Sequence, residues 1–129
     1  MKATRSDSSL RQCIYESDQW SRLLAFLKQE NAFCKARLAE AVATLDDEGS
    51  VEEAEEFNDQ FLSQDSMIEY LENELKKHRK LLQKDLYGDE QVLKNIIKSQ
   101  RILGRNIQNA EEIFSRTRRR FSIYLLSLL

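Results

Sequence analysis

The 129-residue chain has no proline, only three glycines and a single histidine. Proline breaks helices and glycine commonly ends them, so their scarcity predicts long uninterrupted helices. The single histidine also limits metal chemistry. A di-iron bundle needs Glu-x-x-His on two helices, and Glu74 stands four residues before His78 rather than three. We therefore expect no metal and no cofactor.

The chain also lacks a strong charge bias and a long apolar run. Its formal net charge is −2, whereas a dedicated nucleic-acid-binding protein usually carries a clear basic excess. No apolar run reaches the roughly 18–20 residues that span a bilayer, and the first residues are polar, unlike a signal peptide. These features predict a cytoplasmic protein without a membrane span and argue against nucleic acid as a partner.

Cysteine is scarce too, and both copies fall in one predicted helix. Cys13 and Cys34 are 21 residues apart, which is about 30 Å along a helix. A disulfide needs Cα atoms within about 7 Å. We therefore expect two reduced, buried thiols, as is usual in the cytosol.

Apolar residues are plentiful and recur in heptads. Alternating steps of three and four keep one seam of a helix facing its neighbours. In the middle of the chain, one row is Ala54, Phe61, Ile68, Leu75 and Leu82, and the other is Phe57, Gln64, Leu71, His78 and Asp85. Similar rows precede and follow this segment, which predicts three amphipathic helices.

Two glycines divide these helices. Gly49 and Gly88 suit the C-terminal caps of the first and second helices. Ser50 with Glu53 fits a capping box, as does Ser9 with Gln12, and Asp89 can cap the third helix. The sequence thus predicts a disordered tail over 1–8 and one domain over 9–129, with helices at about 9–47, 51–87 and 90–128.

The predicted fold is all-α: a three-helix antiparallel, coiled-coil-like bundle (up-down-up), which dimerisation could complete. With tight turns at the two glycines, the apolar rows of all three helices meet, for example Leu24 with Leu75 and Phe57 with Phe121. The plan resembles three-helix coiled-coil domains such as spectrin-type repeats. The heptads alone carry this resemblance, so it implies a fold and no function.

His78 is the one candidate for chemistry. The register places it in a layer with Trp20 and Gln100, which predicts a partly buried imidazole hydrogen-bonded to Gln100. Alternatively, His78 is the phosphoacceptor of a phosphotransfer bundle. That family resembles this chain in presenting a histidine on a helix, but its His-x-x-Lys-Gly pattern is here His78-Arg79-Lys80-Leu81-Leu82.

No glycine-rich phosphate loop and no serine nucleophile elbow occurs. By register, Cys13 and Cys34 each lie two or more turns from His78, which weakens a zinc site or a Cys–His nucleophile pair. We therefore expect a protein that is not an enzyme.

Polar residues interrupt the apolar rows. In the closed bundle Asn31 faces apolar side chains, so it either tilts to the rim or pairs with a second chain. The arginine block 116–120 lies opposite Glu55 and Glu56, which predicts intramolecular ion pairs.

A basic zone joins residues 76–84 to residues 94–105, and the two stretches are expected to face each other near the second turn. This zone could attract an anionic ligand, or it could be a solvated surface.

Apolar residues outside the seam suggest a contact surface. Phe26 and Phe33 are seven residues apart and lie off the main seam of the first helix. The segment 121–129 is apolar nearly all round, although bundle packing buries one side. We predict that the protein-interaction residues are Phe26, Phe33, Phe121, Tyr124, Leu125 and Leu128.

The resulting hypothesis is a non-enzymatic protein-interaction module, such as an adaptor, small chaperone or regulatory subunit. Its expected partner is a second copy, with a dimer favoured, or another helical protein. The alternatives are a phosphotransfer bundle that uses His78 and an anionic-ligand binder that uses the basic zone over 76–105.

Overall fold

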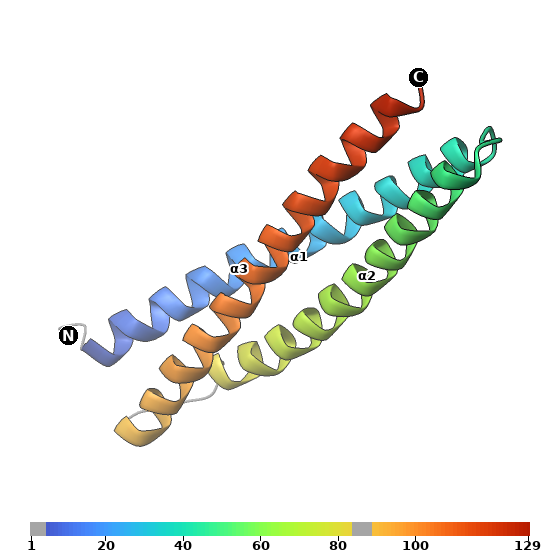
Figure 1. Ribbon diagram of the computed structural model, residues 1–129. Helices are drawn as coiled ribbons and strands as arrows, with labels where there is room; N and C mark the ends of the chain where they lie inside the picture. The colour runs from blue at the N-terminus through green and yellow to red at the C-terminus, as the bar shows by residue number, and fades with distance from the viewer. Residues whose placement is uncertain (1–4, 84–88) are drawn as a thin grey trace.

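The computed structural model describes residues 5–83 and 89–129, and side-chain positions from residue 8 onward. It contains α1 (Arg5–Val42), α2 (Glu48–Leu82) and α3 (Glu90–Ser127). All three helices lie side by side, with α2 antiparallel to α1 and α3 (Figure 1). The predicted three-helix antiparallel bundle is therefore confirmed. Among the described helices, none is long and apolar enough to cross a membrane.

The helix ends differ from the prediction. α1 begins at Arg5 rather than Ser9, so residues 5–8 belong to the helix and Ser9 is not its cap. Nothing in this stretch opposes helix, because it contains neither proline nor glycine. At its other end α1 stops at Val42 rather than near residue 47. Residues 1–4 lie outside the described residues.

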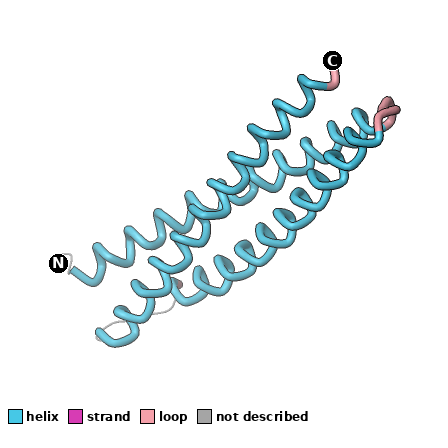
Figure 2. Tube along the Cα trace, in the orientation of Figure 1, coloured by secondary structure: helices cyan, strands magenta, loops and turns pink. Residues whose placement is uncertain are grey.

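The first turn is the short segment 43–47 (Figure 2). Asp47, not Ser50, caps α2: its carboxylate accepts hydrogen bonds from the Ser50 amide at 3.2 Å and the Ser50 hydroxyl at 2.9 Å. A carboxylate is favoured here because it also faces the positive end of the helix dipole. Gly49 therefore lies in the first turn of α2 and does not terminate α1.

The second turn is only partly described. α2 ends at Leu82 with Gln83 as its C-cap. The predicted continuation to residue 87 and the stop at Gly88 fall outside the described residues. Asp89 caps α3 as expected, because its carboxylate accepts a hydrogen bond from the Val92 amide at 3.1 Å.

The predicted heptad rows form the core. Every member of the two α2 rows that the structure describes is buried. In α3 the predicted rows run in steps of seven residues from Leu93 to Leu128 and from Ile96 to Tyr124. All of their members are buried except Leu93 and Leu128, which are half-buried. Leu24, Leu75 and Leu103 share one apolar cluster, which also contains Leu71 and Ile107. The predicted register between the three helices is therefore confirmed.

Asn31 departs from the expectation. It is fully buried, so it does not tilt to the rim. Its Nδ2 donates to the Phe61 carbonyl at 2.8 Å and to Asp65 Oδ1 at 2.6 Å, both on α2. Lys35 pairs with the other oxygen of Asp65 at 2.5 Å. The amide nitrogen of Asn31 thus finds its partners on the neighbouring helix, whereas its Oδ1 is buried without a partner among the described residues.

Candidate protein-interaction surface

The predicted interaction residues divide into exposed and buried sets. Phe26 and Phe33 are 50% and 62% exposed. Phe121 and Tyr124 are only 3% and 5% exposed, so within this bundle their side chains belong to the core and not to its surface. Leu125 and Leu128 are half-buried against the same core cluster. The C-terminal part of α3 therefore belongs to the bundle along one side.

An aromatic cluster holds that side in place. The Phe121 ring lies 5.4 Å from the Phe57 ring and 5.1 Å from the Phe61 ring, measured between centroids. Tyr124 lies 5.3 Å from Phe57, and its hydroxyl donates to the Ser50 carbonyl at 2.7 Å. These contacts connect the end of α3 to the start of α2.

The opposite side of this segment carries apolar residues that we did not predict individually. Ile123 and Leu126 are 66% and 67% exposed. Residues three apart share a helix face, and neither belongs to the heptad rows. A search for apolar positions outside the rows would have found both. α3 thus ends with one apolar side in the core and one in solvent.

The outer side of α1 is uncharged over three turns. Residues four and three apart share a helix face, and Phe26, Gln29 and Phe33 follow that spacing. The positions between them on the same side are small alanines, and all six residues are exposed: Ala25, Phe26, Gln29, Ala32, Phe33 and Ala36. We call these six residues the α1 outer face.

A third apolar surface lies between α2 and α3. Met67 and Ile113 are nearly half exposed and stand at the edges of a hollow of about 80 Å³. Leu27, Ile68 and Phe114 form part of its wall, and Ser63 and Gln64 are its polar members. We call this hollow with its two edges the α2–α3 groove. Of the off-seam residues on α2, Leu62 and Tyr70 are also exposed.

His78 lies where the register placed it. It is buried, and its Nε2 is hydrogen-bonded to Gln100 Oε1. The Gln100 amide donates to the Cys13 carbonyl at 3.2 Å and to Glu16 at 3.4 Å. Because the amide nitrogen of Gln100 is the donor in those bonds, its oxygen accepts and His78 Nε2 carries the proton. Such burial argues against a phosphoacceptor, which must be reached from solvent.

The basic zone is divided between two grooves. Lys76, Arg79 and Lys80 border a hollow between α2 and α1, together with Ser21 and Glu72. The α3 residues Lys94, Arg101 and Arg105 instead line hollows that face α1. The described cations at these hollows therefore line separate hollows along α1 and do not share one site, as the expectation would require.

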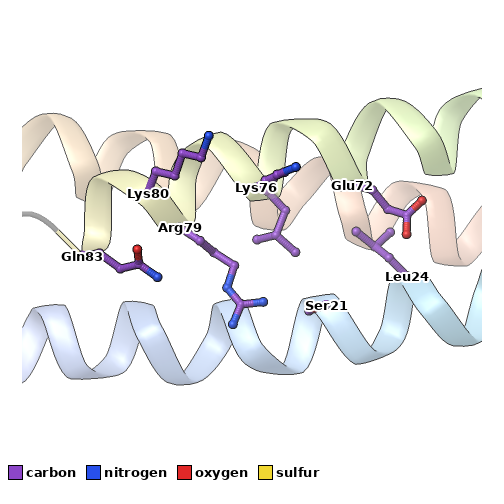
Figure 3. Close-up of a pocket in the computed structure, with 8 residues that line it drawn as sticks. Ser21, Leu24, Glu72, Lys76, Arg79, Lys80 and Gln83 are labelled. Carbon is purple, nitrogen blue, oxygen red and sulfur yellow. The ribbon is translucent and has the colours of Figure 1, made fainter.

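Among the described residues, only one of the α2 cations at this hollow reaches a carboxylate. In Figure 3 the Arg79 side chain points from α2 toward α1, and its Nη2 pairs with Asp18 at 2.5 Å. The side chains of Lys76 and Lys80 stay beside α2 in the same view. The predicted position of Lys84 lies outside the described residues.

The arginine block pairs within the chain, but with other residues than expected. Arg118 lies 3.6 Å from Glu30 on α1. Arg120 donates to Gln60 at 3.1 Å and sits 5.8 Å from the Phe57 ring centroid. In the part of the chain that the structure describes, no ion pair joins these arginines to Glu55 or Glu56. The long arginine side chains reach the nearer partners across the groove.

Both cysteines are buried free thiols, as predicted. Burial raises the pKa of the Cys13 and Cys34 thiols, and the nearby carboxylates of Glu16 and Glu30 raise them further. A thiol held neutral is a weak nucleophile and a weak metal ligand. Within the described residues, no cluster of three potential metal ligands forms.

Comparison with protein-family models, curated proteins and solved structures finds no match to this chain.

Proposed function

We propose that the chain is a non-enzymatic helical interaction module that associates through its exposed apolar helix faces, first of all with further copies of itself. The observation that carries this proposal is the end of α3. Phe121 and Tyr124 on one side fill the core, while Ile123 and Leu126 on the other side remain about two-thirds exposed. Apolar surface that the bundle does not use commonly marks a protein contact.

The α1 outer face supports the same proposal. Phe26 and Phe33 are large aromatics, and such residues dominate the energetics of protein interfaces. They stand on a rigid helix, so docking against another helix would order little additional chain. The two reduced thiols, together with the absence of a disulfide among the described residues, favour action in the cytoplasm.

The mass in solution tests this proposal. Light scattering on a sizing column would compare the wild-type chain with Ile123→Glu/Leu126→Glu and Phe26→Glu/Phe33→Glu over a range of concentrations. We expect the wild type to exceed the monomer mass of 15.2 kDa and at least one pair of charges to reduce it. Point substitutions are preferable to truncation, because removing residues 121–129 would also remove Phe121 and Tyr124 from the core.

A matched control guards against a general effect of added charge. Asn73 is exposed on α2 and belongs to neither the α1 outer face nor the end of α3. Asn73→Glu should leave the mass unchanged. A wild type that remains a monomer at every concentration contradicts the proposal.

A second candidate function is binding of an anionic ligand between α1 and α2. It rests on the three cations around one hollow, of which Arg79 is already paired with Asp18. Titration with inorganic phosphate and with duplex DNA at low and moderate salt would test it. Binding should weaken as salt rises, because phosphate contacts release counterions, and Lys76→Glu/Lys80→Glu should abolish it. Binding that is unaffected by salt or by these substitutions contradicts this candidate.

A further inference from the structure

α1 carries a second heptad seam on the side opposite the core. Alternating steps of four and three residues are the spacing that a helix presents to a neighbouring helix. Phe33 follows the buried Leu24 by nine residues, so the two side chains point about 180° apart at 100° per residue. We use the name α1 outer seam for the exposed residues that follow this spacing: Arg22, Phe26, Gln29, Phe33, Ala36 and Glu40.

The order of side chains along the α1 outer seam suits a second copy of the same helix. In an antiparallel pair, each step forward on one helix is a step back on the other. An alignment that sets Phe26 opposite Ala36 of the second copy therefore also sets Phe33 opposite Gln29. Each aromatic ring, at least half exposed in the single chain, meets a smaller side chain, which is the arrangement that lets facing layers interdigitate.

The same alignment brings opposite charges together at both ends of the seam. Arg22 lies opposite Glu40 of the second copy, and two-fold symmetry repeats this contact. Over the described residues, Arg22 forms no ion pair. The Glu40 side chain is 67% exposed, and only its Oε2 is engaged, by Arg37 at 2.8 Å, so Oε1 remains for Arg22.

A parallel alignment has the opposite electrostatics. It would set Arg22 against Arg22 and Glu40 against Glu40, and the juxtaposition of like charges in an interface is unfavourable. Charge complementarity thus selects the antiparallel second copy.

The flanks of the seam tolerate this contact. Ala25, Ala32 and Ala39 are exposed at intervals of seven residues, and small residues at a helix contact allow a short distance between the axes. In the antiparallel alignment, Ala32 lies beside Ala32 of the second copy, close to the two-fold axis. On the other flank Glu30 approaches its own copy, but each Glu30 is paired with Arg118 of its own chain at 3.6 Å.

We propose that two copies of the chain form a symmetric dimer in which their α1 outer seams pack antiparallel and Arg22 of each copy pairs with Glu40 of the other. This inference rests on the proposed function and names its partner, surface and geometry. Because both copies use the same surface, the contact is isologous and assembly stops at two. One helix pair gives a small interface, so the dimer should dissociate on dilution.

Charge reversal tests the alignment. Arg22→Glu and Glu40→Arg each set like charges against one another at both ends of the seam. Each variant alone should dimerise about 10-fold more weakly than the wild type, which corresponds to a loss of roughly 0.7 kcal/mol at each of two contacts. Light scattering over a range of concentrations would measure this change.

Recombining the charges should restore the dimer. In an equimolar mixture, the two glutamates of the Arg22→Glu chain meet the two arginines of the Glu40→Arg chain, so heterodimers should form as strongly as the wild-type dimer. The double variant Arg22→Glu/Glu40→Arg should recover dimerisation by itself. Circular dichroism would show that every variant keeps the helical fold, and Asn73→Glu on α2 serves as the charge control.

Disulfide trapping tests the position of the two-fold axis. Ala32→Cys places the two new thiols beside the axis, whereas Ala25→Cys places them roughly 20 Å apart along the helices. Both positions are exposed on the same flank, and the native thiols are buried. Oxidised glutathione should therefore link the Ala32→Cys chain into covalent dimers and leave the Ala25→Cys chain unlinked.

The outcomes separate this inference from the broader proposal. A wild type that associates although charge reversal has no effect, or although mixing restores nothing, overturns the antiparallel contact and leaves the proposed function standing. Equal linking of Ala25→Cys and Ala32→Cys does the same, because it indicates a parallel pair. A wild type that remains a monomer at every concentration overturns both.

Discussion

At the scale of single residues, a few polar and small side chains determine how the three helices pack against one another. Asn31, Gln64 and Gln100 stand in the apolar rows, and each uses its side-chain amide to bond a neighbouring helix. Gly104 acts differently, because a Cβ at that position would lie 2.9 Å from Cζ2 of Trp20. The glycine makes room for an indole rather than for a close approach of two backbones.

Gly104→Ala should therefore lower the free energy of unfolding, by about 1 kcal/mol. Alanine is favoured over glycine in a helix by roughly 1 kcal/mol, but inserting a methyl group into packed space costs about 1–3 kcal/mol. The clash should also shift the emission of Trp20, the only tryptophan. Gly49→Ala is the control, since its Cβ would meet nothing closer than 3.6 Å. Greater stability of Gly104→Ala than of the wild type would contradict the packing argument.

The buried thiols predict a loss of stability at alkaline pH. Burial raises the pKa of Cys13 and Cys34 above the ordinary value of 9.0. As pH rises past that value, the thiols of the unfolded chain ionise first, so the unfolded state binds fewer protons and the folded state loses stability. This contribution is complete below about pH 9 and is lost as pH rises through the folded pKa values.

Urea unfolding at pH 7.5 and pH 10 would measure this effect. The wild type should lose more stability between the two values than Cys13→Ala/Cys34→Ala does. The pKa of Tyr124 is also raised, by burial and by Glu53. Both chains contain Tyr124, so its contribution to the loss of stability cancels in the comparison. Equal losses in the two chains would show that the thiols do not contribute.

At the scale of the helices, the spacing of apolar residues explains most of the structure. Each helix is amphipathic with a heptad seam, and the caps at Asp47 and Asp89 set where α2 and α3 begin. The end of α3 is the exception, since it is apolar on two sides. One side belongs to the aromatic cluster of Phe57, Phe61, Phe121 and Tyr124.

Substitutions on the two sides of α3 should differ greatly in their effect on stability. Phe121→Ala should lower the free energy of unfolding by about 3–5 kcal/mol, because it opens a cavity among three aromatic rings. Ile123→Ala should change it by no more than about 0.5 kcal/mol, as expected of an exposed residue. Chemical unfolding at low protein concentration would measure both without a contribution from association. Similar losses for the two would mean that Ile123 is also packed within the monomer.

For the whole molecule, the three helices behave as one unit because each packs on both others. Apolar clusters follow one another along the rod, and residues from all three helices meet in each. A single helix in water would expose its entire seam, and most helical stability in proteins comes from such packing.

Unfolding should accordingly occur in one cooperative transition. Trp20 fluorescence reports on the packing of α1 against α3, while far-ultraviolet circular dichroism reports on all three helices. The two transitions should coincide at a fixed protein concentration. A helical signal that disappears at lower denaturant than the Trp20 signal would show that part of the bundle unfolds independently.

The sequence alone determined the number of helices, their antiparallel order, their register and nearly all of the buried rows. These properties depend on periodicity, and a heptad repeat over five turns or more leaves little freedom in the face that a helix buries. It also correctly paired His78 with Gln100 and Phe57 with Phe121.

Only the tertiary structure decided which polar and apolar residues remain for other partners. Periodicity does not specify the rotation of each helix closely enough to say whether Lys76 faces α1 or α3. Periodicity also could not predict that the Asn31 amide nitrogen bonds to residues of α2, or that Gln64 Oε1 has no donor among the described residues. These outcomes depend on distances of a few ångströms between side chains on different helices, which exist only once the three helices have packed.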